Sequence, residues 1–516
     1  MNKFFSREFV LSDKAVIVYL ALVTLLIHFL TNGRYGYFRD ELYYLACGEH
    51  LDWGYVDQPP FAALMIHLTR PILGDSLFAI RFLPAVCGAL VVFFTGLITR
   101  ELGGGRFAQV LAALAALLGP VYLVIGDFYS MNCFDHLLWA LAAYVLIRIL
   151  KYDRPSLWVL FGLIAGVGLM DKYSMGFLGL GLIVGLALTP ARKYFASIWL
   201  WLGGALATVI FLPHILWEIH YHFPTAEFIH NATLYKNAPL SPPAFLAQVA
   251  LQTLPLSVPI SLAGLYFYFF SREGKPYRVL GWIFVAVLGL FFSTHAKPYY
   301  LAPTFFMLFA GGAFAIELFI QRRVATATKW LKPASVTVLV LGGLIVLPYG
   351  VPVLPVDTFI RYENFLGLHP GTGERDKPGE LPQTYADMFG WENMVATVAK
   401  VYDRLAPEEK ARTLIYCNNY GEAGAIDFFG KKYGLPKASS GHNSYWLWGP
   451  QNPSADMVIT VGEHLQDVQM TFNRVDLAAI VVSEHARSFE TNLPIYIGRD
   501  PKMPLKEVWP RTKDFI

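Results

Sequence analysis

Charged residues are scarce in this sequence, because Asp, Glu, Lys and Arg together make up only 15% of its 516 residues. About a quarter of an average soluble chain is charged, whereas 55% of this chain is hydrophobic. Repeated apolar runs of about 20 residues match the roughly 30 Å hydrocarbon core of a bilayer. The composition therefore predicts a polytopic α-helical membrane protein.

Basic clusters and paired cysteines are also lacking. The net charge is only +3 and no basic run stands out, so nucleic acid is excluded as a partner. The cysteines show no CxxC spacing, which argues against a zinc ribbon or a disulfide framework: they are Cys47, Cys87, Cys133 and Cys417. The first apolar run has no small-residue cleavage site, so we expect it to remain as an anchor.

Eleven apolar segments are predicted to be membrane helices. They cover residues 15–31, 77–99, 107–125, 136–150, 157–170, 174–190, 196–213, 246–270, 279–294, 300–320 and 334–350. Six loops rich in Lys and Arg fall on one side of this arrangement, which the positive-inside rule makes cytoplasmic. The other, extracytoplasmic side receives residues 32–76 and everything after Gly350.

The composition changes after Pro355, where charged residues, Asn, Gly and Pro replace the apolar runs. Short β-like runs (RTLIYC, DMVITV, LAAIVVS and LPIYIG) alternate with helix-like stretches, which indicates an α/β domain. We therefore predict a transmembrane module over residues 1–355 and a soluble extracytoplasmic domain over residues 356–516.

Acidic residues gather in the first extracytoplasmic loop, FRDELYYLACGEHLDWGYVDQPPF, residues 38–61. We expect a helix along the membrane surface, with Tyr43 and Tyr44 at headgroup level. The DQPP turn would then return Asp57 toward Asp40. A solvated rim would explain any single acid, but acids among aromatic residues at membrane depth are costly unless they are paired or functional. A carboxylate here can take a proton from an incoming hydroxyl.

Two further sets of charged residues lie near the same predicted face. Asp127 and Asp135 belong to GDFYSMNCFDHLLW, and Asp135 opens a predicted helix, where capping and function are both reasonable roles. Isolated cations, against the orientation bias, lie at the outer ends of predicted spans: Arg81, Lys172 and Lys297. The phosphate of an ordinary lipid or of a lipid-linked substrate would explain each of them.

Histidines crowd the loop after the seventh predicted span, at positions 214, 220, 222 and 230. Histidine and acidic side chains together can bind a divalent metal, although interfacial histidines without a metal are as good an explanation. The only cofactor that we consider is a divalent metal ion, with Asp57 and His222 as its candidate ligands.

Residues from about 30 to 320 resemble the GT-C glycosyltransferases, in particular bacterial family 39 (protein O-mannosyltransferase-like) and the lipid A aminoarabinose transferases. The resemblance lies in RDELYYLACGEHLDWGYVDQPPFAALM, FAIRFLPAVCGALVVFFTGLITRELGG, GLIAGVGLMDKYSMGFLGL, LPHILWEIHYHFPTAEF and HAKPYYLAPTFFMLFAGGA. It implies a GT-C fold with about eleven membrane helices in the cell inner membrane. It also implies transfer of a sugar from a polyprenyl-phosphate donor to a lipid, glycan or protein acceptor on the extracytoplasmic face.

The resemblance assigns roles to acidic positions of this sequence. Asp40 matches the aspartate proposed as general base, Glu41 its neighbour, and Asp135 a second acidic position. Asp57 matches an acid before a proline where relatives often have Glu-Lys-Pro, and Gln58 replaces the lysine here.

Without that lysine, other cations are left to bind the donor phosphate: Arg81, Lys172 and Lys297. The predicted substrate pocket contains Tyr43, Tyr44, Asp57, Tyr299 and Tyr300. Basic groups aimed at the departing phosphate would lower the barrier. A single displacement at the anomeric carbon predicts inversion.

Two other classes of protein stay open. A transporter or flippase of a lipid-linked or small polar solute would place its binding residues near the bilayer midplane on repeated halves. Here the polar residues cluster at one face and no two halves match, which argues against it. A catalytically silent receptor or assembly factor would depend on the C-terminal domain and would tolerate Asp40→Asn.

Overall fold

The computed structural model describes residues 13–294, 296–322, 330–368, 374–375, 377 and 379–516. The chain divides into two compact units. We call the first the helical unit, made of Met1–Arg34, Phe78–Ile215 and Pro239–Pro355. The second is the mixed unit, made of Tyr35–Leu77, Leu216–Ala238 and Val356–Ile516. Two early loops therefore group with residues 356–516.

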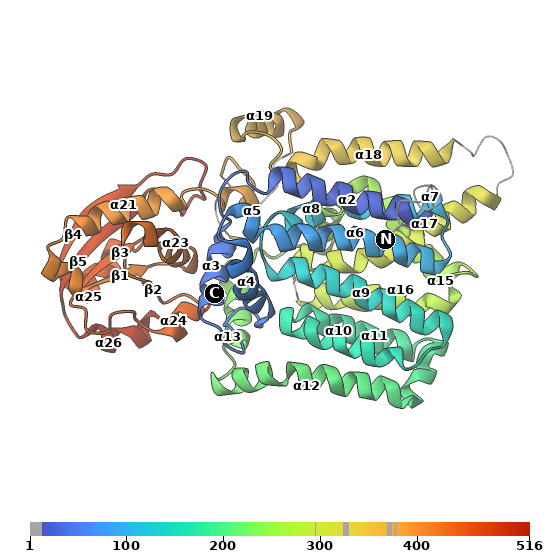
Figure 1. Cartoon of the computed structure of the whole chain (residues 1–516), viewed down its shortest axis with the longest axis horizontal. Coiled ribbons are helices and arrows are strands. Elements are labelled where there is room, and N and C mark those ends of the chain that lie inside the picture. Colours follow the sequence, from blue (N-terminus) through green and yellow to red (C-terminus); the bar gives the residue numbers. More distant parts are fainter. Residues whose placement is uncertain (1–12, 295, 323–329, 369–373, 376, 378) are drawn as a thin grey trace. The chain divides into compact units, whose positions relative to one another are not determined.

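Apolar helices dominate the helical unit and confirm a multi-span membrane protein (Figure 1). Six helices of the described residues are long and apolar enough to cross a bilayer: Leu77–Leu102, Met131–Tyr152, Ile198–His220, Lys275–Thr294, Pro298–Arg322 and Leu331–Gly350. They contain α5 and α6 (Leu77–Ile80 and Phe82–Leu102), α9 (Met131–Tyr152), α12 (Ile198–His220), α16 (Arg278–Thr294), α17 (Phe305–Arg322) and α18 (Leu331–Gly350).

Three further pairs of helices among the described residues are long and apolar enough together, but each pair is bent, as in a broken span or a re-entrant loop. α7 and α8 (Arg106–Leu118 and Pro120–Asp127) meet at 60°, α11 (Ser174–Ala187) meets the 3₁₀ turn Pro190–Ala196 at 110°, and α14 (Pro242–Gln252) meets Pro255–Phe270, which contains α15 (Val258–Phe270), at 97°. A proline opens the second member of each pair, and proline lacks the N–H that would continue the preceding helix.

Shorter apolar helices complete the set: α2 (Asp13–Thr31), α4 (Phe61–Leu73) and α10 (Leu157–Asp171). All eleven predicted membrane segments fall on these helices, whereas α4 was predicted to be loop. The fourth span begins at Met131 rather than at residue 136.

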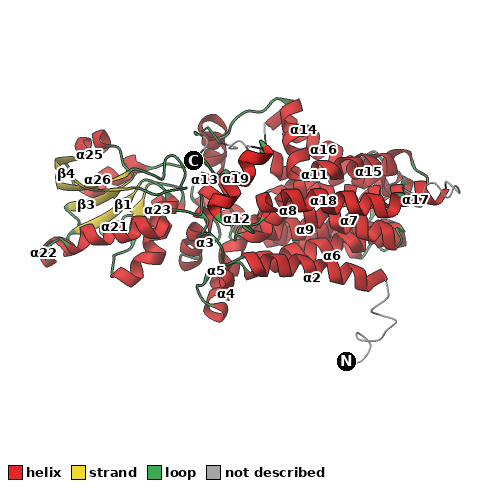
Figure 2. Ribbon diagram, turned by 90° about the horizontal axis from the view of Figure 1, so that it is seen from above, coloured by secondary structure: helices red, strands yellow, loops and turns green. Residues whose placement is uncertain are grey.

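The mixed unit contains a five-stranded sheet in the order β2-β1-β3-β5-β4. β1 (Thr413–Cys417) runs parallel to β2 (Ala438–Ser440) and β3 (Met457–Val461), whereas β5 (Leu493–Pro501) is antiparallel to β3 and to β4 (Phe472–Val481). The predicted β-like runs all fall on strands of this sheet. Figure 2 shows helices on both sides of it: α21 (Trp391–Asp403) on one side, α25 (Leu465–Thr471) and α26 (Leu505–Val508) on the other. The predicted α/β domain is confirmed.

The helix predicted in the first loop is α3 (Arg39–Glu49), and it packs against α23 (Tyr420–Phe429) within the mixed unit (Figure 1). α23 begins sharply because the side chain of Asn419 accepts hydrogen bonds from the backbone N–H groups of Gly421 and Glu422. A Cβ atom at Gly424 would lie 2.8 Å from the backbone carbon and oxygen of Leu42. Glycine at this position therefore lets the two helices approach closely.

Candidate functional site

Asp40 is the most accessible acid of the predicted site, and its side chain is 37% exposed. Its Oδ1 atom accepts a hydrogen bond of 2.8 Å from the hydroxyl of Tyr420. The Nε atom of Arg39 lies 3.8 Å from the same oxygen. No hydrogen bond to Oδ2 is found among the described residues. One carboxylate oxygen of Asp40 is thus held, and the other can accept a proton.

A buried charge network lies behind Asp40. Arg39 is 8% exposed, and its Nη1 atom lies 4.0 Å from Oδ1 of Asp387. Nη1 of Arg487 lies 3.3 Å from Oδ2 of Asp387. Burial raises the pKa of Asp387, and the two arginines oppose that shift. Because the carboxylate of Asp387 lies close to both Arg39 and Arg487, we expect Arg39 to keep a fixed position beside Asp40.

Asp57 lies in the same unit and is held by Tyr43. The hydroxyl of Tyr43 donates to Oδ1 of Asp57 over 2.9 Å and lies 2.8 Å from Oγ of Ser444. Burial, together with the nearby charge of Asp40, raises the pKa of Asp57 to about 6. The structure therefore brings two of the three predicted acids of the first loop, Asp40 and Asp57, into one tyrosine-rich cluster.

Glu41 and Tyr44 are placed differently from Asp40. Glu41 is fully buried, and its Oε2 atom accepts a 2.8 Å hydrogen bond from the backbone N–H of Phe38, which caps α3. Tyr44 is 5% exposed. Burial on α3 gives both side chains a structural role, and their predicted parts in catalysis and in the substrate pocket stay predictions.

In the helical unit, Lys172 and Asp135 form a buried pair. Nζ of Lys172 lies 3.7 Å from Oδ2 of Asp135 and donates to Oδ1 of Asn132 over 2.5 Å. The hydroxyl of Ser174 donates to Oδ1 of Asp135. Asp135 is the fifth residue of α9, whose N-cap is Ser130. The capping role considered for Asp135 is therefore wrong, and the buried cation gives its charge a partner instead.

Two predicted pocket tyrosines complete this cluster. Nζ of Lys172 lies 4.6 Å from the ring centre of Tyr300 and 5.4 Å from that of Tyr299. An ammonium group above an aromatic face gains electrostatic attraction. Lys172 is 8% exposed, so its ammonium group is largely desolvated, and it shares the cluster with the carboxylate of Asp135.

The other two predicted cations also belong to the helical unit, and Lys297 is two residues from Tyr299 in the chain. Arg81 is fully buried, and its Nη1 atom donates to the carbonyl oxygens of Asn32 and Arg34 over 3.2 and 3.4 Å. These contacts fasten the end of α2 to the start of α6. Lys297 is half-buried and precedes the 3₁₀ turn Pro298–Thr304.

The predicted metal ligands do not form a metal centre in the described part of the chain. There, no three His, Cys, Asp or Glu side chains gather closely enough to hold an ion. His222 is exposed, and His214 pairs with the hydroxyl of Tyr173 over 2.5 Å. A divalent ion on Asp57 and His222 stays a prediction from the sequence, and no chemical step below passes through a metal.

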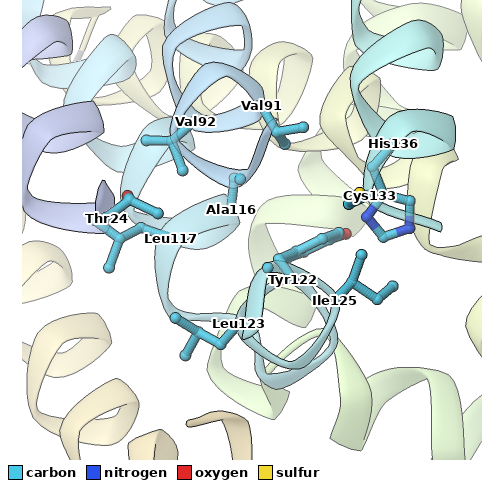
Figure 3. A pocket seen from close by; sticks show the side chains of 12 residues that line it. Thr24, Val91, Val92, Ala116, Leu117, Tyr122, Leu123, Ile125, Cys133 and His136 are labelled. Carbon is cyan, nitrogen blue, oxygen red and sulfur yellow. The ribbon is translucent and has the colours of Figure 1, made fainter. Parts of the chain in front are cut away.

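A small, mostly apolar pocket lies in the helical unit (Figure 3). Its polar lining includes Tyr122 and His136, whose rings meet edge to face at 5.6 Å. The hydroxyl of Tyr122 donates to the carbonyl of Ala302 over 3.0 Å. None of the predicted site residues lines this pocket.

Comparison with solved structures decides the fold. The chain superposes on ArnT from Cupriavidus metallidurans bound to undecaprenyl phosphate with a TM-score of 0.60 and 16% identity, over 94% of this chain and 98% of that one. The apo state of the same protein gives 0.58 and 16%, over 94% and 97%. The chain has the GT-C fold.

Two weaker similarities accompany this GT-C match. The apo oligosaccharyltransferase of Archaeoglobus fulgidus superposes with a TM-score of 0.49 and 13% identity, over 90% of this chain and 70% of that one. Residues 57–217 match the family model of the dolichyl-phosphate-mannose-protein mannosyltransferases. No curated protein matches the sequence.

The sequence-based prediction missed the residues that the C-terminal part of this GT-C chain brings to the first loop. They are Asp387, Tyr420, Ser444 and Arg487. Spacing in the sequence gives no sign of them, because Tyr420 lies 380 positions from Asp40. The usable signal was the segment NNYG, in which an asparagine opens a helix and a tyrosine follows at its first turn.

Proposed function

We propose that this GT-C chain is an inverting glycosyltransferase that moves a sugar from a polyprenyl-phosphate donor to a lipid, glycan or protein acceptor. We place the reaction on the extracytoplasmic face of the cell inner membrane, with residues 356–516 on that side. The observation that carries the proposal is the partly exposed carboxylate of Asp40. Its Oδ1 atom accepts a hydrogen bond from Tyr420, and its Oδ2 atom accepts none from the described residues.

In this proposal Asp40 is the general base. The acceptor hydroxyl oxygen attacks the anomeric carbon of the donor and passes its proton to Oδ2 of Asp40. The bond between that carbon and the phosphate oxygen breaks, and its electron pair stays with the phosphate. Because attack and departure occur on opposite faces of the carbon, the product has the inverted configuration.

Lys172 is our proposed ligand for the donor phosphate. Its buried ammonium group can neutralise the charge that grows on the departing phosphate, and such stabilisation is large where water is excluded. Tyr299 and Tyr300 beside it would line the donor pocket. The shared fold with ArnT, solved with undecaprenyl phosphate, supports a lipid phosphate as the ligand.

The first test compares the envelope of cells with and without the gene by mass spectrometry of glycolipids and glycoproteins. We expect one sugar modification to disappear with the gene and to return with the wild-type chain. Asp40→Asn should not restore it, because an amide cannot accept the proton. Asp75→Asn is the matched control, since Asp75 is an exposed acid of the same loop paired with Arg70. Full restoration by Asp40→Asn would refute the base assignment.

The second test measures binding of undecaprenyl phosphate to the purified chain in nanodiscs. We expect Lys172→Met to weaken binding about tenfold or more, because a charge-assisted contact is lost. Lys193→Met is the control, because Lys193 is an exposed lysine paired with Asp153. Unchanged binding by Lys172→Met would contradict its role. If labelled undecaprenyl phosphate crossed the bilayer without any glycosidic bond forming, the flippase alternative would replace this proposal.

A further inference from the structure

Tyr420 touches the proposed base although it belongs to the C-terminal part of the chain. Its hydroxyl donates to Oδ1 of Asp40 over 2.8 Å, within the mixed unit. It is the first residue of α23, at the point where Asn419 caps that helix. No feature of the first loop itself provides an equivalent hydrogen bond to Asp40 among the described residues.

The ring of Tyr420 is fixed on several sides. It lies 4.7 Å from the ring centre of Tyr43 and 4.7 Å from that of His442. The guanidinium carbon of Arg39 lies 5.3 Å from its centre. Burial raises the pKa of Tyr420 well above its usual value. The phenol therefore keeps its proton and remains a hydrogen-bond donor throughout the physiological pH range.

We propose that Tyr420 is a positioning residue that orients the carboxylate of Asp40 and stabilises its ionised form, so that the C-terminal part of the chain completes the catalytic centre. The inference rests on the proposed function, since it assigns a task to Tyr420 only if Asp40 is the base. By holding Oδ1, the phenol leaves Oδ2 as the oxygen that meets the acceptor hydroxyl.

Two consequences distinguish this role from simple packing. A hydrogen bond donated to a carboxylate favours its charged form, so the acidic limb of the pH–rate profile should depend on Tyr420. Fixed orientation of a base affects the rate even where the base is fully ionised, so the plateau at high pH should depend on it too. The charged and titratable groups that act on Asp40 are Arg39, Asp57, Asp387 and Tyr420.

The experiment uses the full-length chain in proteoliposomes, with the donor and acceptor that the envelope comparison identifies. We expect Tyr420→Phe to lower the plateau rate about tenfold and to move the acidic limb about one pH unit toward higher pH. Phenylalanine keeps the ring contacts, so binding of undecaprenyl phosphate and the melting temperature should stay close to wild type. The shift should persist in an Asp57→Asn background, because Asp57 itself titrates in this range.

Tyr445→Phe is the matched control. Tyr445 is also buried in the mixed unit and donates to a carboxylate, Oδ2 of Asp427, over 2.9 Å. We expect it to leave the pH profile unchanged, and a shift equal to that of Tyr420→Phe would overturn the inference. If Tyr420→Phe had a wild-type plateau rate and pH profile while Asp40→Asn was inactive, the inference about Tyr420 would be overturned and the proposed function would stand. A fully active Asp40→Asn would instead overturn the proposed function.

Discussion

Gly424→Ala is expected to destabilise the mixed unit, because the added methyl group meets backbone rather than a side chain. Its Cβ would lie 2.8 Å from the carbon and oxygen of Leu42, at the centre of α3. Because backbone atoms cannot move aside as a flexible side chain can, the overpacking cost lies in the upper part of the usual range, at about 2–3 kcal/mol. The better helix propensity of alanine returns about 1 kcal/mol. We expect a net loss of about 1–2 kcal/mol in the free energy of unfolding.

For a unit of this size, that loss corresponds to a decrease of roughly 2–8 °C in the melting temperature. Thermal unfolding in detergent, monitored by pulse proteolysis, measures this decrease in melting temperature. Gly179→Ala is the control, because that glycine has open space around its Cβ position and should be neutral or slightly stabilising. Leu42→Ala should not rescue Gly424→Ala, since the obstructing atoms belong to the backbone. A melting temperature at or above wild type for Gly424→Ala would refute the close packing of α3 on α23.

Three further predictions follow from single contacts. Asp57 has a raised folded-state pKa of about 6. Its contribution to the free energy of unfolding is therefore favourable at low pH and is lost as the pH rises from about 4 to 6. In pH-dependent melts, the stability of Asp57→Asn relative to wild type should rise by about 2 kcal/mol over that window. Arg81→Gln should destabilise the helical unit by about 1–3 kcal/mol and lower its melting temperature, while undecaprenyl phosphate binding stays unchanged. The opposite pattern would support the prediction that Arg81 is a phosphate ligand. Glu49→Gln should cost less than about 1 kcal/mol despite the nearby Lys431 and Lys437, because water screens exposed pairs; a larger loss would show that these pairs are shielded.

The membrane helices could be predicted from the sequence because apolar length alone defines them. Every predicted segment falls on a helix. The bends were not predicted, because apolar length alone was used and the run over residues 107–125 stays apolar across the break. The signal for each bend is the proline that opens its second member. The helix α4 was missed because its 13 residues are fewer than a full span needs.

The candidate site was predictable only where its residues are close in the sequence. Asp40, Tyr43 and Asp57 share one loop, and turn chemistry was enough to bring them together. The pairing of Lys172 with Asp135 was not predicted, because nothing local connects the two loops. Tyr420 could not be found at all by spacing, since its contact with Asp40 depends on two helices meeting at a glycine.

The contact between α3 and α23 joins two parts of the chain that are synthesised far apart in time. The ribosome makes Tyr420 380 residues after Asp40. At about 5–20 residues per second, that interval lasts roughly 20–80 seconds. For most of it, α3 has neither its phenol donor nor the carboxylate of Asp387 that pairs with Arg39. A nascent chain released before residue 420 would therefore carry the acidic loop without the partner that orients it.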